Sequence, residues 1–331
     1  MDLSSLATVN NTPILLIGYN RPELIKKRLE EIGKFQFKHL YISIDGSNPS
    51  ITNKMRQTIK ECRPSLQNIE IIHTKFHKLN LGLTKHITSS ISNILLTYEY
   101  IVVIEDDVRL SENFYLNMLN GLNLLKKHKI KGIVTGFSPI EITKYRCNKN
   151  FWRLTQYTPI WGWSCSAELW SSYKYDISAE NINSELRKSL VWNNLTRNQK
   201  NIWTGRFEKI QKYPFSTWDI QLQYLSFKNS FTNLSPFSRI TNNEGFSDTR
   251  SMHTKGTKPK WMQHGDIDNS IIVSNKFSHL SKLIMTIDSN TYAGDTQFFK
   301  SIKFFKKIFF LQKLFKNKIR SISNWDNGLD C

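Results

Sequence analysis

Short apolar runs alternate with helical patterns over the first 136 residues. The first run, residues 13–18, reads Pro-Ile-Leu-Leu-Ile-Gly and predicts a buried strand. Further strands are predicted at 40–44, 69–72, 100–104 and 132–135, with helices between them at 22–32, 51–62, 83–96 and 114–127. The run 100–104 is continuous and β-branched, which is typical of a strand in a parallel sheet covered on both faces. The pattern predicts an α/β fold with a Rossmann-like, mostly parallel sheet flanked by helices.

The second half of the chain is less regular. It holds most of the tryptophans, a helical pattern at 219–227 and a polar stretch at 241–265 that we expect to be a loop ordered by ligands. We divide the chain into 1–136, 137–290 as the second half of the same domain, and a tail, 291–331.

The tail has a composition of its own. Residues 300–320 contain eight basic residues and no acidic one. On a helix, one face carries Phe304, Phe305, Ile308, Leu311, Phe315 and Ile319, and the other carries Lys303, Lys306, Lys313 and Arg320. Such a basic amphipathic helix is typical of an anionic membrane surface. The alternative is a C-terminal helix that packs on the body with a solvated basic face.

Charge and cysteine content limit the kind of partner and the cellular compartment. The net charge of +19 indicates an anionic partner: nucleic acid, a phospholipid surface or a phosphorylated substrate. The four cysteines form no CxxC motif, which fits a reducing compartment. No signal peptide or membrane span of ~20 apolar residues is evident. Together with the tail, this predicts a cytoplasmic protein, peripheral at the inner face of the cytoplasmic membrane.

Three adjacent acids, Glu105-Asp106-Asp107, follow the apolar strand 100–104 directly. The carboxyl ends of strands in open α/β sheets are where ligands bind. Adjacent carboxylates raise one another's pKa unless a cation holds them. Mg²⁺ or Mn²⁺ bound to a diphosphate suits such hard oxygen ligands. The alternative is a solvated acidic turn.

Two weaker candidates lie at the same predicted sheet edge. Asp45 ends the second strand and could accept hydrogen bonds from a ribose or a base, although a turn former before Gly46 is an equal interpretation. The backbone amides of 80–83 and Lys85 could face a nucleotide, or the segment could simply start a helix. The chain has neither a GxGxxG pattern nor a P-loop.

The order of these segments along the chain resembles that of a known enzyme family. Asn-Arg-Pro after strand one, Ser-Ile-Asp-Gly after strand two, then Asn-Leu-Gly-Leu and Val-Val-Ile-Glu-Asp-Asp resemble a GT-A nucleotide-sugar glycosyltransferase. Downstream, 159–163 (Pro-Ile-Trp-Gly-Trp), 167–170 (Ala-Glu-Leu-Trp) and 218–219 (Trp-Asp) are similar to N-acetylglucosaminyltransferase I and its bacterial relatives. The resemblance covers roughly residues 13–255.

The resemblance implies an inverting, metal-dependent hexosyl- or N-acetylhexosaminyltransferase, usually with Mn²⁺. By that resemblance Asp107 binds the metal, and Asp106 and Glu105 lie near the ribose and the donor sugar. Arg21 and Asp45 would lie near the nucleotide, and Asp219 would be the catalytic base. Residues 1–136 would then bind a nucleotide-sugar, for which we expect a UDP-sugar, and 137–290 the acceptor.

The chemistry of the second half fits that assignment. Transfer to a hydroxyl needs a base, for which a carboxylate such as Asp219 is suitable. Aromatic faces, Trp163 among them, would serve as platforms for sugars. His253 in the late polar stretch could reach the metal, although a lone loop histidine is more often solvated. Asp219 has a second interpretation as an acid at a helix N-terminus.

We therefore predict a glycosyltransferase of bacterial cell-surface polysaccharide synthesis (O-antigen, capsule or lipooligosaccharide), whose acceptor is a glycan or a lipid-linked glycan. One alternative is a sugar nucleotidyltransferase, although the Gly-rich, basic loop that such enzymes carry after the first strand is absent. A nucleic-acid-binding protein is the other, although the basic residues concentrate in the tail and no nucleic-acid motif is recognised. We expect no nucleic-acid partner.

Overall fold

The computed structural model describes residues 9–139, 151–248, 250, 267–272, 277–278, 288 and 291–292. Its strands are β1 (Ile14–Gly18), β2 (Phe37–Ile44), β3 (Ile69–Phe76), β4 (Tyr100–Glu105), β5 (Val108–Leu110), β6 (Val134–Thr135), β7 (Trp152–Thr155), β8 (Trp163–Ser166), β9 (Asn233–Pro236), β10 (Thr241–Asn243) and β11 (Phe277–Ser278). Its α-helices are α2 (Pro22–Ile32), α3 (Pro49–Cys62), α4 (Leu83–Leu95), α5 (Phe114–His128), α6 (Ala167–Trp170), α7 (Ile182–Arg187), α8 (Leu190–Asn193), α9 (Arg197–Lys212) and α10 (Asp219–Lys228). Short 3₁₀ turns lie at Arg63–Leu66 and Gly245–Ser247.

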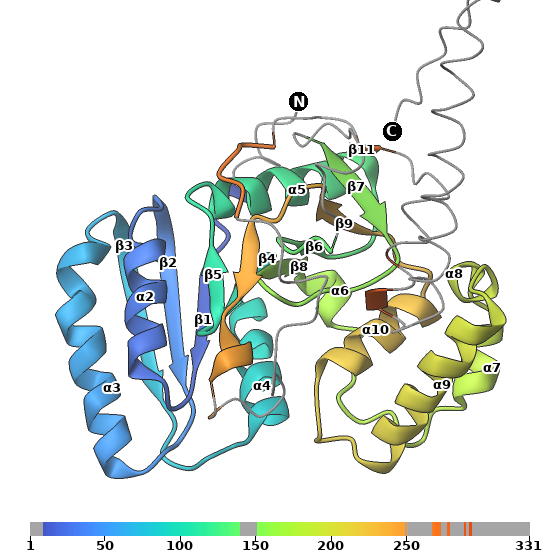
Figure 1. Ribbon diagram of the computed structural model, residues 1–331, viewed down its shortest axis with the longest axis horizontal. Helices are drawn as coiled ribbons and strands as arrows, with labels where there is room; N and C mark the ends of the chain where they lie inside the picture. Colours follow the sequence, from blue (N-terminus) through green and yellow to red (C-terminus); the bar gives the residue numbers. More distant parts are fainter. Residues whose placement is uncertain are drawn as a thin grey trace, which may run out of the picture.

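The main sheet has nine strands in the order β11-β7-β9-β6-β8-β4-β1-β2-β3 (Figure 1). Strands β1 to β4 pair in parallel, whereas β8 runs antiparallel to both β4 and β6. A mostly parallel sheet with helices on both faces confirms the predicted α/β class. The predicted strand at 132–135 is shorter than expected, and β8 separates it from β4.

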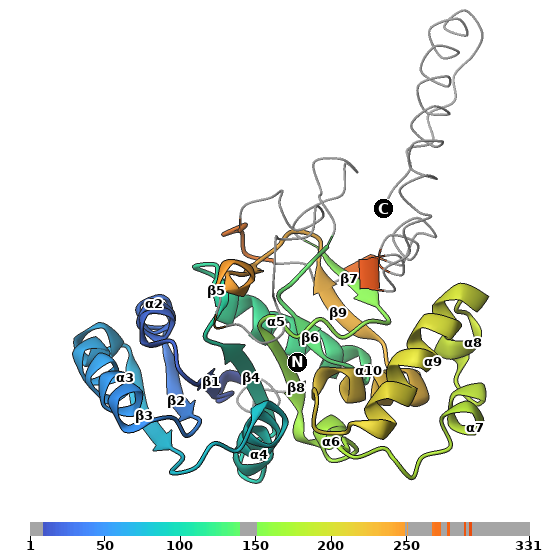
Figure 2. The same cartoon turned by 60° about the horizontal axis from the view of Figure 1, so that its bottom comes forward.

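Alternation of side chains along the central strands divides the core into two layers. In β1, Ile14 and Leu16 pack into one cluster with residues of α2, α3 and α5. Leu15 and Ile17 face the other way, into a cluster with residues of α4, α6 and α10. Because both faces are covered, these strands read as continuous apolar runs in the sequence. Figure 2 shows α2 and α3 on one side of the sheet and α4 on the other.

The second half adds a small helical body beside the sheet. Helices α7 to α10 share their own apolar cluster, which includes Trp192, Trp203, Phe207 and Phe227. Helix α10 takes part in both this cluster and the sheet cluster, so it joins the helical body to the sheet (Figure 2).

Two expectations for the second half need comment. The stretch 241–265 is not wholly a loop, because Thr241–Asn243 pairs as β10 with β5 directly after the acid triplet. Most of its remainder, with His253 and the later tail 293–331, lies outside the described residues. The division at 136 and 290 stays a prediction. No described helix is long and apolar enough to cross a membrane.

Candidate functional site

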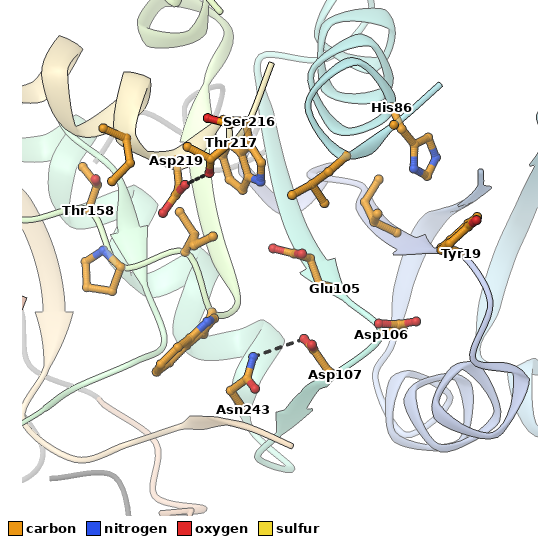
Figure 3. A pocket seen from close by; sticks show the side chains of 18 of the residues that line it. Tyr19, His86, Glu105, Asp106, Asp107, Thr158, Ser216, Thr217, Asp219 and Asn243 are labelled. Atoms are coloured by element: carbon orange, nitrogen blue, oxygen red, sulfur yellow. Dashed lines mark hydrogen bonds between the residues drawn. The ribbon is translucent and has the colours of Figure 1, made fainter. Parts of the chain in front are cut away.

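A cavity of about 1000 Å³ opens at the carboxyl ends of β1, β2 and β4. This is the edge where parallel α/β sheets bind ligands. Its walls come from both halves of the chain: the strand ends on one side and the start of α10 with part of α9 on the other. Figure 3 shows this cavity from close by.

The acid triplet lies at the centre of the cavity. In β4, Val102 and Ile104 face the α2 layer and Val103 faces the α10 layer, so alternation directs Glu105 toward α10. Asp106 and Asp107 follow in the turn before β5, and both are buried. All three acids line the cavity (Figure 3).

Arg21 neutralises part of the triplet. Pro22 starts α2 and fixes the turn after β1, where the Arg21 side chain reaches across to the end of β4. Its Nε donates to Asp106 Oδ2 over 3.2 Å, its Nη2 donates to Asp106 Oδ1, and its Nη1 donates to Asp107 Oδ2 over 3.2 Å. This forked pairing joins β1 to β4 and is the strong form of an arginine–carboxylate contact.

Asp107 is held from a second side. Asn243 of β10 donates its Nδ2 to Asp107 Oδ1 over 3.2 Å, and the backbone N–H of Glu244 donates to the Asp107 carbonyl over 2.8 Å. The pairing of β10 with β5 brings Asn243 to this position, which the prediction of a loop at 241–265 missed.

Glu105 has no such partner. Among the described residues no hydrogen bond or ion pair reaches its carboxylate. Burial, with the charges of Asp107 and Asp106 and then of Asp219, raises the pKa of Glu105 well above its usual 4.5. Burial also raises the pKa of Asp106 to about 7, against the opposing effect of Arg21. Within the described part of the chain, Arg21 is thus the one ion-pair partner of the triplet, and a further cation would stabilise it.

Asp45 organises the loop beside the triplet. Its Oδ1 accepts from the backbone N–H groups of Gly46 and Leu81, each over 2.8 Å, and its Oδ2 accepts from Gly82 over 3.1 Å. Gly82 has φ +76°, which favours glycine there, and a Cβ on Gly46 would lie 2.2 Å from the Leu79 backbone, so the close approach requires a glycine at 46. Asp45 lines the cavity, but its carboxylate oxygens are already engaged by these amides.

His86 is a cavity residue that the sequence reasoning missed. It lies in the first turn of α4, is buried, and its Nε2 is 2.8 Å from Ser43 Oγ of β2. Burial lowers the pKa of His86 to about 4, so the ring is neutral at pH 7. Lys85, the neighbour that the sequence predicted to face a nucleotide, is exposed and does not line the cavity. The one-residue difference turns the two side chains to different faces of the helix.

Asp219 lies across the cavity from the triplet. It is the first residue of α10, and its Oδ1 accepts from Thr217 Oγ1 (Figure 3). The side chain is half-buried, lines the cavity and acts on Glu105 through its charge. An acid in the first turn of a helix is stabilised by the helix dipole.

The tryptophans at 161 and 163 lie on different sides of a turn. Gly162 has φ +68°, and a Cβ there would lie 2.8 Å from Thr241 Cγ2. Trp161 lines the cavity, whereas Trp163 is fully buried between Trp170 and Trp218, with ring centroids 6.1 and 5.5 Å away. Contrary to the prediction, Trp163 therefore offers no face to a sugar, because with Cys165 it lies on the face of β8 that packs in the cluster with α6 and α10.

The acids could hold a divalent cation only together with groups that a substrate supplies. Among the described residues no group of three or more His, Cys, Asp and Glu side chains could hold a metal. Mg²⁺ at phosphate sites needs only one or two carboxylates, because phosphates and water fill its other positions. Asp107 and Glu105 line the cavity with hard oxygen donors and could supply those carboxylates, with the two Asp107 oxygens already accepting from Arg21 and Asn243. His253, the other predicted ligand, is outside the described residues.

Comparisons with known proteins do not assign a family. No family model and no curated protein matches the chain. Among solved structures, a UDP-glucose pyrophosphorylase complexed with UDP-glucose is similar with a TM-score of 0.35 and 10% identity, over 68% of this chain and 89% of that one. At that TM-score the likeness carries no argument about function, which must come from the site.

Proposed function

We propose that the protein is an inverting glycosyltransferase that moves a sugar from a nucleotide-sugar, first of all a UDP-sugar, to a hydroxyl of a glycan acceptor. The observation that carries the proposal is the cavity itself. The acid triplet lies at the end of β4 on one side, and Asp219 lies at the start of α10 on the other. A donor bound at the triplet would hold its sugar between the two.

The nucleotide would occupy the part of the cavity next to β1 and β2. Tyr19 and the buried, neutral ring of His86 line this part, and the exposed Tyr19 ring would stack on a base. Arg21 supplies a fixed positive charge toward the diphosphate. The amides that Asp45 holds in place keep the loop 80–82 against the strand ends.

The proposed cofactor is Mn²⁺ or Mg²⁺, held by Asp107 with Glu105 beside it. When bound, it would stabilise the charge on the departing diphosphate. Arg21 would share that task, because its guanidinium already lies between Asp106 and Asp107.

Asp219 is the proposed base. Its carboxylate would take the proton of the acceptor hydroxyl while that oxygen attacks the anomeric carbon. The bond from the anomeric carbon to the diphosphate oxygen breaks, and the nucleoside diphosphate leaves with the electron pair. Attack from the side of α10, opposite the triplet, inverts the anomeric centre.

The cellular setting is proposed from the sequence alone. A cell-surface glycan or lipid-linked acceptor would explain a basic amphipathic segment at 300–320, which lies outside the described residues. Deleting 300–331 should then release the protein from anionic liposomes while transfer to soluble acceptors remains. Liposome binding that survives the deletion would contradict this assignment.

The main alternative is a sugar nucleotidyltransferase. Such an enzyme releases pyrophosphate and needs cations for it near the first strand. Among residues 18–22, which follow the apolar core of β1, Arg21 is the one cation, and it is paired with Asp106 and Asp107. The described residues therefore favour transfer from a ready nucleotide-sugar.

Nucleotide release from a panel of UDP-, GDP-, CMP- and dTDP-sugars with Mn²⁺ tests the proposal. One donor should be hydrolysed slowly, and Asp107→Asn or a chelator should abolish that hydrolysis, whereas Glu208→Gln, an exposed acid on α9, should not. Pyrophosphate formation from a nucleoside triphosphate and a sugar 1-phosphate would support the alternative instead. Salt-sensitive binding of nucleic acid, with no effect of any nucleotide-sugar on the melting temperature, would contradict both.

A further inference from the structure

Three arginines line the cavity, and one of them differs from the others. Arg21 pairs with Asp106 and Asp107, and Arg250 pairs with Glu23 and Asp248. Arg206 of α9 also lines the cavity, but within the described part of the chain no carboxylate lies within ion-pair distance of its guanidinium. A half-buried cation without an acid partner needs an anion or water to replace its lost hydration.

The contacts of Arg206 with other described residues hold its guanidinium in place and engage one of its donors. Its Nη1 donates to the backbone carbonyl of Tyr292 over 2.7 Å, and its Cζ lies 4.5 Å over the Trp203 ring. A guanidinium has five N–H donors, and the described residues accept from one of them. Burial lowers the pKa of Arg206, with Asp219 opposing, but an arginine stays protonated at neutral pH.

The position of Arg206 assigns it to the Asp219 side of the cavity. Helix α9, which carries Arg206, packs with α10 in the helical body, and the charge of Asp219 at the start of α10 acts on Arg206. The triplet responds instead to Arg21 and, for Asp106 and Asp107, to Arg28. An anion bound at Arg206 would therefore lie beside the proposed base and away from the diphosphate site.

Two aromatic residues that line the cavity lie beside Arg206. The Trp203 ring packs against its guanidinium, and the Tyr292 backbone carbonyl accepts from it. Aromatic faces suit the apolar faces of sugar rings, and a fixed guanidinium suits a carboxylate or a phosphate group. The combination is complementary to a sugar that carries an acidic group.

From these observations we propose that Arg206 recognises an acidic group, carboxylate or phosphate, on the acceptor glycan. The acceptor would thus be an acidic glycan, such as one that ends in a uronic acid, a sialic acid or a sugar phosphate. This inference rests on the proposed function only in calling the glycan an acceptor. Binding of the acidic sugar can be measured without any transfer.

The test is glycan binding by the whole protein with matched probes. Oligosaccharides that end in glucuronate, in a sialic acid or in a sugar 6-phosphate are compared with their carboxyl-reduced or dephosphorylated counterparts, by calorimetry and on a glycan array. At least one acidic probe should bind the wild type about tenfold to a hundredfold more tightly than its neutral counterpart, as expected for a hydrogen bond to a charged group. Equal binding of every acidic and neutral pair would overturn the proposal without any variant.

Two variants locate the preference. Arg206→Gln should remove the preference for the acidic probe, and Arg206→Lys should retain part of it. Lys209→Gln, an exposed cation on the same helix, should keep the wild-type ratio. An Arg206→Gln protein that is folded, binds UDP more weakly than wild type and keeps its full preference for acidic glycans would show that the anion belongs to the donor, which contradicts the proposal.

The outcome is separable from that of the proposed function. If no nucleotide-sugar is hydrolysed but the acidic preference depends on Arg206, the transferase proposal fails and this inference stands as a binding site. If a donor is hydrolysed and acidic glycans show no preference, the transferase stands and the role of Arg206 fails.

Discussion

Glu105 and Asp219 carry their carboxylates into the same cavity from opposite halves of the chain, and the charge of Asp219 helps to raise the pKa of Glu105. Glu105 ends β4 and Asp219 starts α10, two elements 114 residues apart that both pack on the apolar layer around Trp163 and Trp218. The shared layer fixes the distance between the acids. The electrostatics of the site therefore depend on how the helical body packs against the sheet.

The first prediction concerns Glu105 and pH. The folded-state pKa of Glu105 is raised well above 4.5, so folding favours its protonated form, and the wild type loses stability as pH rises from about 4.5 through the folded pKa. Glu105→Gln removes this loss of stability with rising pH. The variant should melt about 2 °C or more above wild type near pH 8 and at the wild-type temperature near pH 4.5.

Melting curves without nucleotide or metal, measured by circular dichroism across this pH range, check the prediction. Glu208→Gln is the control and should stay within about 0.5 kcal/mol of wild type, as exposed substitutions do. A Glu105→Gln protein less stable than wild type near pH 8 would show that the carboxylate has a stabilising partner there.

A second prediction concerns Arg21. Removing it leaves Asp106 and Asp107 buried without their cation, so Arg21→Gln should destabilise the protein above pH 7. We expect a loss of about 2–4 kcal/mol, slightly below the range for fully buried pairs because 14% of the Arg21 side chain is exposed. Since burial raises the pKa of Asp106 to about 7, the loss should shrink at acidic pH, where that carboxyl is protonated.

Urea denaturation near pH 8 and near pH 5 measures both effects. Arg250→Gln is the matched control: its pairs with Glu23 and Asp248 lie at the surface and should contribute at most about 1 kcal/mol. An equal loss at both pH values would mean that Arg21 acts through packing and not through charge.

Asp45 gives a third prediction. Asp45→Asn places an amide N–H₂ where one carboxylate oxygen now accepts from backbone amides, so at least one of the three hydrogen bonds is lost. We expect a destabilisation of about 1–3 kcal/mol and faster hydrogen exchange of the Leu81 and Gly82 amides. Asp176→Asn, an exposed acid that accepts from Ser178, should change stability by less. Unchanged exchange at Leu81 and Gly82 would contradict the organising role of Asp45.

Much of the sheet could be predicted because its strands are buried on both faces. The runs at 13–18, 40–44 and 100–104 are apolar apart from Ser43, and each corresponds to an observed strand. The position of the acid triplet also followed from the sequence, since residues directly after a parallel strand must lie at its carboxyl edge. Local pattern and tertiary position agree there, so sequence reasoning was sufficient.

The remaining residues depend on contacts that the sequence does not display. Trp163 is in the core and Trp161 in the cavity because Gly162 adopts a positive φ, which two neighbouring tryptophans do not reveal. Asn243 reaches Asp107 only through the pairing of β10 with β5, 131 to 135 residues apart along the chain. His86 lies one helical position from Lys85. A helical-face argument over 83–90 would have favoured the histidine, because His86 shares the buried face with Ile87 and Ser90, whereas Lys85 is exposed.

Transfer kinetics of Asp219→Asn, with the donor identified by the hydrolysis panel and a glycan acceptor, test the central claim most directly. The claim is that one cavity joins a donor site at the triplet to a base on α10. We predict that kcat for transfer falls about 10²–10⁴-fold, as loss of a general base does, while the affinity for the nucleotide stays near wild type. Glu208→Gln should transfer at the wild-type rate. An Asp219→Asn protein that transfers sugar as fast as wild type would contradict the account.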